Sequence, residues 1–226
     1  FHFKYAETKP FLKIGAYQVG GQIINYFNRD LDIIIVGKFL GTEILGGYSL
    51  AKQLIRRPLQ IINPIVNRVG TSVFPKFQNS HEKLRINFNK LLNSLGILNA
   101  FIYGTAVIFS HWLILLFYGE GYSYIEFYFQ LFAVVVYLRS MGGVVGVLII
   151  TTGRTDFDFY WNIMITVATP IVITLGALQS LEMVVIYLGL LQLLLLIPGW
   201  YFFYYRLIKF SFQSYFKANL YPLVIA

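Results

Sequence analysis

Residues 183–205 read MVVIYLGLLQLLLLIPGWYFFYY and contain no charged side chain. About 20 apolar residues suffice for one helical crossing of a bilayer, so this stretch predicts a membrane-spanning helix. The whole chain has a similar character, because 57% of its 226 residues are hydrophobic and 12% are charged. A soluble domain averages about 25% charged residues. The composition therefore predicts a membrane protein with several crossings.

Helices are the expected spanning elements, because a helix satisfies its own backbone hydrogen bonds inside lipid. We predict an all-α fold, a polytopic transmembrane helix bundle with helices at about 14–40, 43–76, 87–117, 125–150, 159–177 and 183–205. Residues 210–226 are expected to lead into a further, truncated helix. The chain is therefore expected to be a fragment of a longer protein, cut at both ends.

The loop charges test this count, since Lys and Arg accumulate on the cytoplasmic side of membrane proteins. Alternate helix ends carry Lys4, Lys9, Lys13, Lys76, Lys83, Arg85, Lys90, Arg154, Arg206, Lys209 and Lys217. The opposite loops, at 41–42, 118–124 and 178–182, carry no Lys or Arg. This split supports six crossings and predicts that both ends of the chain are cytoplasmic.

Seven basic residues fall inside the apolar segments, where charge is expensive and faces a cavity, a partner or a substrate. They are Arg29, Lys38, Lys52, Arg56, Arg57, Arg68 and Arg139. Asp30 and Asp32 are the acids at comparable depth. The positive surplus indicates that the missing anion is a ligand. Lys38, near a predicted outer end, is expected to extend to the interface.

Two polar stripes, each within about 80° of arc at 100° per residue, run along the first two predicted helices. The first stripe consists of Gln18, Gln22, Asn25, Arg29 and Asp32. The second consists of Lys52, Arg56, Gln60, Asn63 and Asn67, on a helix that Pro58 and Pro64 are expected to kink. We expect both stripes to face a shared wet cavity. The alternative is that the amides bond the helices to each other.

The charged members of the stripes differ in what they can pair with. Lys52 and Arg56 cannot neutralise each other, whereas Arg29 and Asp32 are three residues apart and could form an ion pair. Asp32 is also a candidate site for a coupling cation or proton. Arg139 lies on the same side as Gly142, Gly143 and Gly146, so we expect it to pack against protein at a close helix contact.

Catalytic and metal-binding patterns are absent from the sequence. There is no Cys, the three His lack metal-ligand spacing, and no nucleophile motif or phosphate-binding Gly loop occurs. We therefore expect no enzyme activity, no cofactor, no metal and no nucleic acid partner. Asn162, Thr166 and Thr169 align on one helix face, where they could coordinate a cation, although threonine bonding back to its own helix is the commoner arrangement.

Several motifs resemble one family of membrane proteins. They are KPFLKIG at 9–15, NYFNRDLDIIIVGKFLG at 25–41, LGGYSLA at 45–51, Arg57-Pro58 and VFPKF at 73–77, with Arg139-Ser140, Gly153-Arg154 and PGWY at 198–201 farther on. This pattern closely resembles the second half of bacterial polysaccharide flippases, the lipid-linked oligosaccharide exporters of the MATE-like superfamily (MOP), most of all the colanic-acid exporter type.

The resemblance implies two six-helix lobes facing a central cavity, with this chain as the second lobe. It implies that an undecaprenyl-pyrophosphate-linked oligosaccharide crosses the bacterial inner membrane by alternating access. Pathway polymerase and chain-length proteins are expected partners, and H+ or Na+ are candidate coupling ions. We expect Lys52 and Arg56, with Arg29 second, to contact the pyrophosphate. We expect the glycan to be bound by Gln18, Gln22, Asn25, Asn63 and Asn67.

Three other functions are weighed against this one. A MATE-like antiporter of cationic drugs would favour an acidic cavity, and these stripes are basic. A membrane polysaccharide polymerase or lipid-linked glycosyltransferase usually needs a sizeable soluble loop or a carboxylate centre. A purely structural membrane subunit would leave the membrane-depth bases unexplained.

Overall fold

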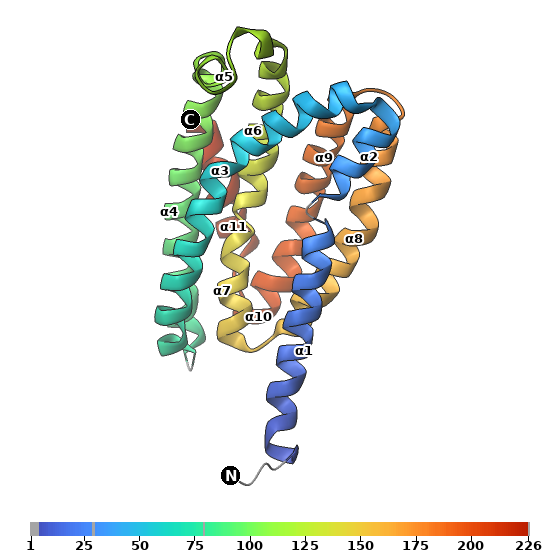
Figure 1. Cartoon of the computed structure of the whole chain (residues 1–226). Coiled ribbons are helices and arrows are strands. Elements are labelled where there is room, and N and C mark those ends of the chain that lie inside the picture. The colour runs from blue at the N-terminus through green and yellow to red at the C-terminus, as the bar shows by residue number, and fades with distance from the viewer. Residues whose placement is uncertain (1–4, 29, 79, 226) are drawn as a thin grey trace.

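The described elements are all helices, which confirms the predicted all-α bundle (Figure 1). The computed structural model describes residues 5–28, 30–78 and 80–225. In chain order the elements are α1 (Tyr5–Asn28), α2 (Leu31–Leu40), α3 (Thr42–Val73), η1 (Phe74–Phe77), α4 (His81–Ile108), α5 (Ser110–Tyr118), η2 (Glu120–Ile125), α6 (Glu126–Ser140), α7 (Gly143–Thr152), α8 (Thr155–Ala177), α9 (Leu181–Gly199), η3 (Trp200–Tyr205), α10 (Arg206–Ile208) and α11 (Phe212–Ile225).

The connections gather at two ends of the bundle, as the loop charges predict. The turns after η1, α7 and α10 lie at the lower end in Figure 1, which we call the basic end. The turns after α2 and α8, and the α5–η2 corner, lie at the upper end, which we call the opposite end. Helix α11 turns back into the bundle beside α4. Six passes and a further helix therefore follow one another in the expected order.

Four segments are long and apolar enough to cross a membrane on length and composition. They are His81–Ile108, Glu120–Thr152, Thr155–Ala177 and Leu181–Ile208. The first two predicted crossings are not among them. Helix α2 has only 10 residues, and α3 carries the polar stripe that lowers its hydropathy. Crossing by α1–α2 and α3 therefore stays a prediction.

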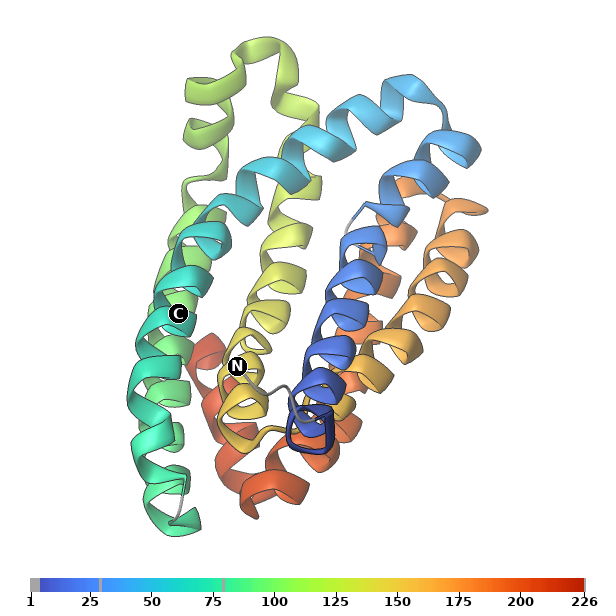
Figure 2. The same ribbon diagram turned by 60° about the horizontal axis from the view of Figure 1, so that its bottom comes forward.

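Three predicted helices are broken, and one continues through two prolines. The first ends at Asn28, and α2 begins at Leu31. The third, predicted at 87–117, is divided between α4 and α5 at Phe109. The fourth is divided between α6 and α7 at Met141 and Gly142. Helix α3 by contrast stays α-helical through Pro58 and Pro64 and curves along its length (Figure 2). The prolines bend this helix without ending it.

The helices form two packed groups. Helices α1 and α2 pack on α8, which packs on α9, while α3 packs on α6 and α7, and α4 packs on α6 and α11. The α6–α9 contact joins the groups. The apolar core has one cluster that includes Tyr48, Phe129 and Val184 and a second that includes Phe88 and Leu148. In Figure 2 the α1–α8–α9 group stands opposite α3, α4 and α7.

Glycine permits the closest helix approaches. A Cβ on Gly143 would lie 2.6 Å from Asn63 Oδ1, and one on Gly70 would lie 2.6 Å from Val147 Cγ2. These contacts join α3 to α7, and among Gly142, Gly143 and Gly146 the expected close packing is observed at Gly143. At the α8–α9 crossing, a Cβ on Gly176 would lie 2.6 Å from Val184 Cα.

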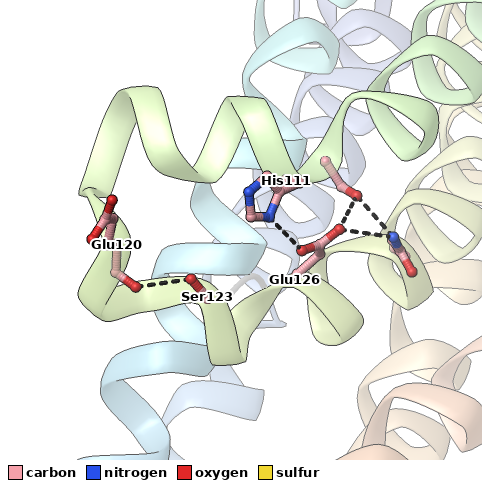
Figure 3. A network of polar contacts seen from close by, with 6 residues as sticks. His111, Glu120, Ser123 and Glu126 are labelled. Atoms are coloured by element: carbon pink, nitrogen blue, oxygen red, sulfur yellow. Dashed lines mark hydrogen bonds and ion pairs between the residues drawn. The ribbon is translucent and has the colours of Figure 1, made fainter.

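A polar network closes the opposite end between α5 and α6 (Figure 3). Ser110 Oγ donates to Glu126 Oε1 at 2.9 Å, and Gln130 Nε2 donates to Ser110 Oγ at 2.8 Å. His111 Nδ1 lies 3.2 Å from Glu126 Oε2. The network fixes the short α5 helix against α6, together with Ile114, which is buried in the apolar core.

The α8–α9 crossing gives a direct test of this packing. Gly176→Ala should lower the stability of the protein by about 1–3 kcal/mol, because the new methyl group meets backbone atoms that cannot move aside. Gly46→Ala is the matched control, since nothing lies within 4 Å of a Cβ there. Melting temperature in detergent measures both. Equal melting temperatures for the two variants would contradict the close crossing.

Candidate functional site

A cavity of about 570 Å³ lies between the two groups of helices. Side chains from α1, α3, α6, α7, α8, α9 and α11 line it. The break between α6 and α7 opens directly onto it, since Leu138, Arg139, Met141 and Gly142 all belong to the lining. Small-molecule sites commonly have volumes of about 300–1,000 Å³, so this cavity can hold a ligand.

Four of the residues predicted to bind substrate line this cavity. Gln22 and Asn25 reach it from α1, and Arg56 and Asn63 reach it from α3. The two polar stripes therefore face one shared cavity over these residues, as the helical spacing predicts. Because Asn63 also faces Gly143, this amide contributes both to helix packing and to the cavity wall.

The other predicted residues do not line the cavity. Gln18 is exposed, and Asn67 is exposed with its Oδ1 directed toward Gly146. Lys52 and Asp32 are buried, with exposed fractions of 7% and 8%. Arg29 lies outside the described residues, and so does its predicted ion pair with Asp32.

Asp32 instead holds Lys52 and Tyr48. Lys52 Nζ donates to Asp32 Oδ1 at 2.6 Å, and Tyr48 Oη donates to Asp32 Oδ2 at 2.5 Å. Asp30 Oδ1 is 3.9 Å from the same ammonium group. The expected free charge on Lys52 is therefore neutralised, because the carboxylate of α2 lies against it. This buried pair fastens α2 to α3.

Among the residues that the structure describes, the basic ones in the cavity lining are Arg56 and Arg139. Arg139 lines the cavity together with Gly142, Gly143 and Gly146, so the four residues lie on one side as expected. Its side chain is exposed to the cavity and is not packed at a close helix contact. The two guanidinium groups lie within electrostatic range of each other. Neither forms an ion pair with a residue that the structure describes.

Sequence reasoning missed several polar residues that the cavity contains. Asp158, Gln192 and Asn219 line it, from α8, α9 and α11. Asp158 Oδ2 would lie 3.3 Å from a Cβ on Gly21, so glycine lets α1 approach this carboxylate. Gln192 could be recognised from the sequence as a candidate lining residue, because it interrupts an otherwise apolar run. Asp158 is harder to recognise from the sequence, because an acid in the first turn of a helix is also explained by its favourable interaction with the helix dipole.

The α8 polar row bonds mainly within the protein. Thr166 Oγ1 donates to Asn162 O at 2.6 Å and accepts from Asn28 Nδ2 at 2.7 Å. The commoner arrangement, threonine bonding back to its helix, is thus the one observed for Thr166. Asn28 Oδ1 and Asn219 Oδ1 are buried lining atoms without a hydrogen-bond partner in the described part of the chain.

The Lys52–Asp32 pair predicts a stability effect. Lys52→Met should lower stability by about 3–5 kcal/mol, because it leaves a buried carboxylate without its cation. The Asp32→Asn/Lys52→Met double variant should recover most of that loss, since no charge remains. Melting temperatures in detergent compare the three proteins. A single variant as stable as the parent would contradict the structural role of the pair.

Comparison with known proteins places these features in a family. The family described as polysaccharide biosynthesis protein matches residues 1–127. The chain is 38% identical over 166 residues, 73% of its length, to the lipopolysaccharide biosynthesis protein WzxC of Escherichia coli K12. It is 32% identical over 216 residues, 95% of its length, to the amylovoran biosynthesis protein AmsL of Erwinia amylovora.

The matching region is part of each longer relative. Over the full chain it is 27% identical to the teichuronic acid biosynthesis protein TuaB of Bacillus subtilis 168. The matches cover 34% of WzxC, 56% of AmsL and 47% of TuaB. No solved structure matches the chain. These matches confirm the resemblance drawn from the motifs, and the chain belongs to the polysaccharide biosynthesis protein family of membrane proteins.

Proposed function

We propose that this chain is the second lobe of a flippase that moves an undecaprenyl-pyrophosphate-linked oligosaccharide across the bacterial inner membrane by alternating access. The observation that carries the proposal is the pair Arg56 and Arg139, which line a polar cavity without an ion pair to any described residue. Membrane-depth bases that face a cavity mark substrate pathways. The family's role in polysaccharide biosynthesis supports a saccharide cargo.

The cavity chemistry suits the two parts of such a cargo. A guanidinium group makes two parallel hydrogen bonds to a phosphate, and it keeps its charge where lysine would not. Arg56 and Arg139 come from helices of the same group, α3 and α6, so both can reach one pyrophosphate. Gln22, Asn25 and Asn63 offer donors and acceptors to sugar hydroxyls, while the lipid tail stays in the bilayer.

The remaining candidate residues take different places in this proposal. Lys52 acts through Asp32 by fixing α2 to α3, one helical turn from Arg56. Gln18 and Asn67 extend the stripes beyond the cavity and would meet a longer glycan. Arg29 stays a second candidate for the pyrophosphate.

The proposal includes orientation and partners. The gathering of basic connections at one end supports a cytoplasmic basic end. Helix α1 begins at that end, whereas α11 starts there and runs back into the bundle (Figure 1). The oligosaccharide would be supplied on that side and passed to a polymerase and chain-length protein across the membrane. Transport rather than catalysis is favoured by a lining of arginine and amide side chains, which bind anions and hydroxyls.

A second candidate, a MATE-like antiporter of cationic drugs, rests on Asp158. This carboxylate lines the same cavity beside Asn162 and would attract a cation. The two arginines in the lining outnumber it, so an anionic cargo remains the favoured one.

Arg56 provides the test. In the full-length protein, Arg56→Ala should reduce glycan export at least about tenfold, because a hydrogen-bonded charge contact of about 1.5–3 kcal/mol is lost. Arg57→Ala is the matched control, since Arg57 is exposed and does not line the cavity. Surface glycan and inner-leaflet lipid-linked glycan are measured in a deletion strain carrying each variant, with protein level from immunoblots.

Two results would contradict this proposal. Export at the parental level by the Arg56→Ala protein would remove the assignment of Arg56. Unchanged glycan export together with loss of cationic dye extrusion in Asp158→Asn would favour the antiporter.

Ion coupling is a separate proposal that concerns Asp32. A proton or Na+ that took this carboxylate would compete with Lys52 and loosen α2 from α3. In proteoliposomes, Asp32→Asn/Lys52→Met, which leaves no buried charge, should transport without responding to an imposed H+ or Na+ gradient. If the double variant keeps the parental response to the gradient, Asp32 is not the coupling site.

A further inference from the structure

A second cavity opens at the basic end, away from the proposed cargo site. It has a volume of about 440 Å³ and lies where the first turn of α4, the end of α7 and α10 meet. Leu84 and Leu207 form its floor and are buried. His81, Arg154 and Arg206 stand around its rim, and all three are exposed. The cavity therefore combines an apolar floor with a basic rim.

One aromatic ring positions both arginines of the rim. Arg154 Cζ is 4.1 Å from the centroid of Phe157, and Arg206 Cζ is 5.6 Å from the same centroid. Guanidinium groups stack on aromatic faces, and stacking reduces the freedom that each loses on binding a ligand. The two cationic groups are thus held near each other before any anion arrives.

The charge at this rim is only partly neutralised. Arg154 Nε and Nη2 donate to the two carboxylate oxygens of Asp156, each at 2.9 Å. A guanidinium group has five N–H donors, so three remain for another acceptor. Arg206 forms no ion pair with any residue in the described ranges. Two cations with one carboxylate leave a net positive charge.

Exposed aromatic residues beside Arg206 indicate where this rim lies relative to a bilayer. Arg206 Cζ is 5.7 Å from the ring of Tyr201 and 5.8 Å from that of Phe202, and both rings are exposed. Trp200 Nε1 donates to Phe210 O at 2.9 Å. Trp and Tyr with neighbouring bases are typical of the membrane–water interface. A ligand here can place a phosphate at the arginines and an acyl chain along the aromatic rings.

We propose that this cavity binds the phosphate of an anionic phospholipid in the leaflet at the basic end, through Arg206 and the free edge of Arg154. Basic pockets between membrane helices are suited to anionic headgroups. The bound lipid would hold α4, α7 and α10 together at their ends. This site is distinct from the cavity of Arg56 and Arg139, and it does not depend on the proposed transport function.

Lipid binding to the purified full-length protein tests the proposal. Native mass spectrometry with added phosphatidylglycerol gives the affinity of the tightest-bound lipid for each variant. Arg206→Gln should weaken it about tenfold or more, because a charge-assisted hydrogen bond is lost. Lys209→Gln is the matched control: Lys209 lies at the same end, over the Tyr205 ring at 4.7 Å, and does not line the cavity. It should change the affinity less than about threefold.

Further measurements distinguish a specific lipid site from nonspecific electrostatic attraction and from a site for free phosphate. Equal losses in the two variants would overturn the proposal, because any surface charge would then serve. Phosphatidylcholine bound as tightly as phosphatidylglycerol would also overturn it. Inorganic phosphate that displaces the lipid at equal concentration would mean a free-phosphate site instead. Melting temperatures near the parental value confirm that Arg206→Gln is folded, so a loss of lipid reports on the site.

Discussion

A charged side chain buried in an apolar helix bundle needs a partner of opposite charge. In this bundle Lys52 and Asp32 are buried together and neutralise each other. The ammonium and carboxylate groups are 2.6 Å apart, and Tyr48 completes the hydrogen bonding of Asp32. Helix α2 is short and follows the break after Asn28, and the pair holds it against α3. Such pairs are often close to neutral for stability, but losing one partner is expensive. Helix α3, which carries Arg56 to the cavity, is held by this pair on the α2 side and by packing on α6 and α7.

Arg56 and Arg139 also carry charge inside the bundle, but unlike Lys52 they have no carboxylate partner among the described residues. Asp32 is already occupied by Lys52 and Tyr48, so it does not serve the arginine one turn farther along α3. Arg139, near the end of α6, lines the cavity, whose polar lining has more amides than carboxylates. Asp158 is the acid of the lining. A cavity with two arginines and one carboxylate favours an anionic, hydroxyl-rich ligand, in keeping with a family of polysaccharide biosynthesis proteins.

The sequence predicts the helices better than it predicts their breaks. Apolar runs predict the four segments that are long and apolar enough to cross a membrane, and the 100° spacing brings Gln22, Asn25, Arg56 and Asn63 to one cavity. The same spacing fails for Asp32, because the helix breaks between Asn28 and Leu31 and the register does not carry across. It holds for Arg139, which lines the cavity with Gly142, Gly143 and Gly146, although the sequence does not show that this arginine is exposed there. The pairing of Asp32 with Lys52 is a tertiary contact between residues 20 positions apart in the sequence, and helical periodicity cannot reveal such a contact.

The central claim is that Arg56 and Arg139 together hold the anionic headgroup of the cargo. A structure of the complete protein with bound lipid-linked oligosaccharide tests it most directly. The pyrophosphate should lie between the two arginines, with both guanidinium groups in hydrogen-bond contact with its oxygens and with sugar density beside Asn25 and Asn63. A pyrophosphate bound elsewhere, with Arg56 and Arg139 paired to carboxylates of the rest of the protein, would contradict it.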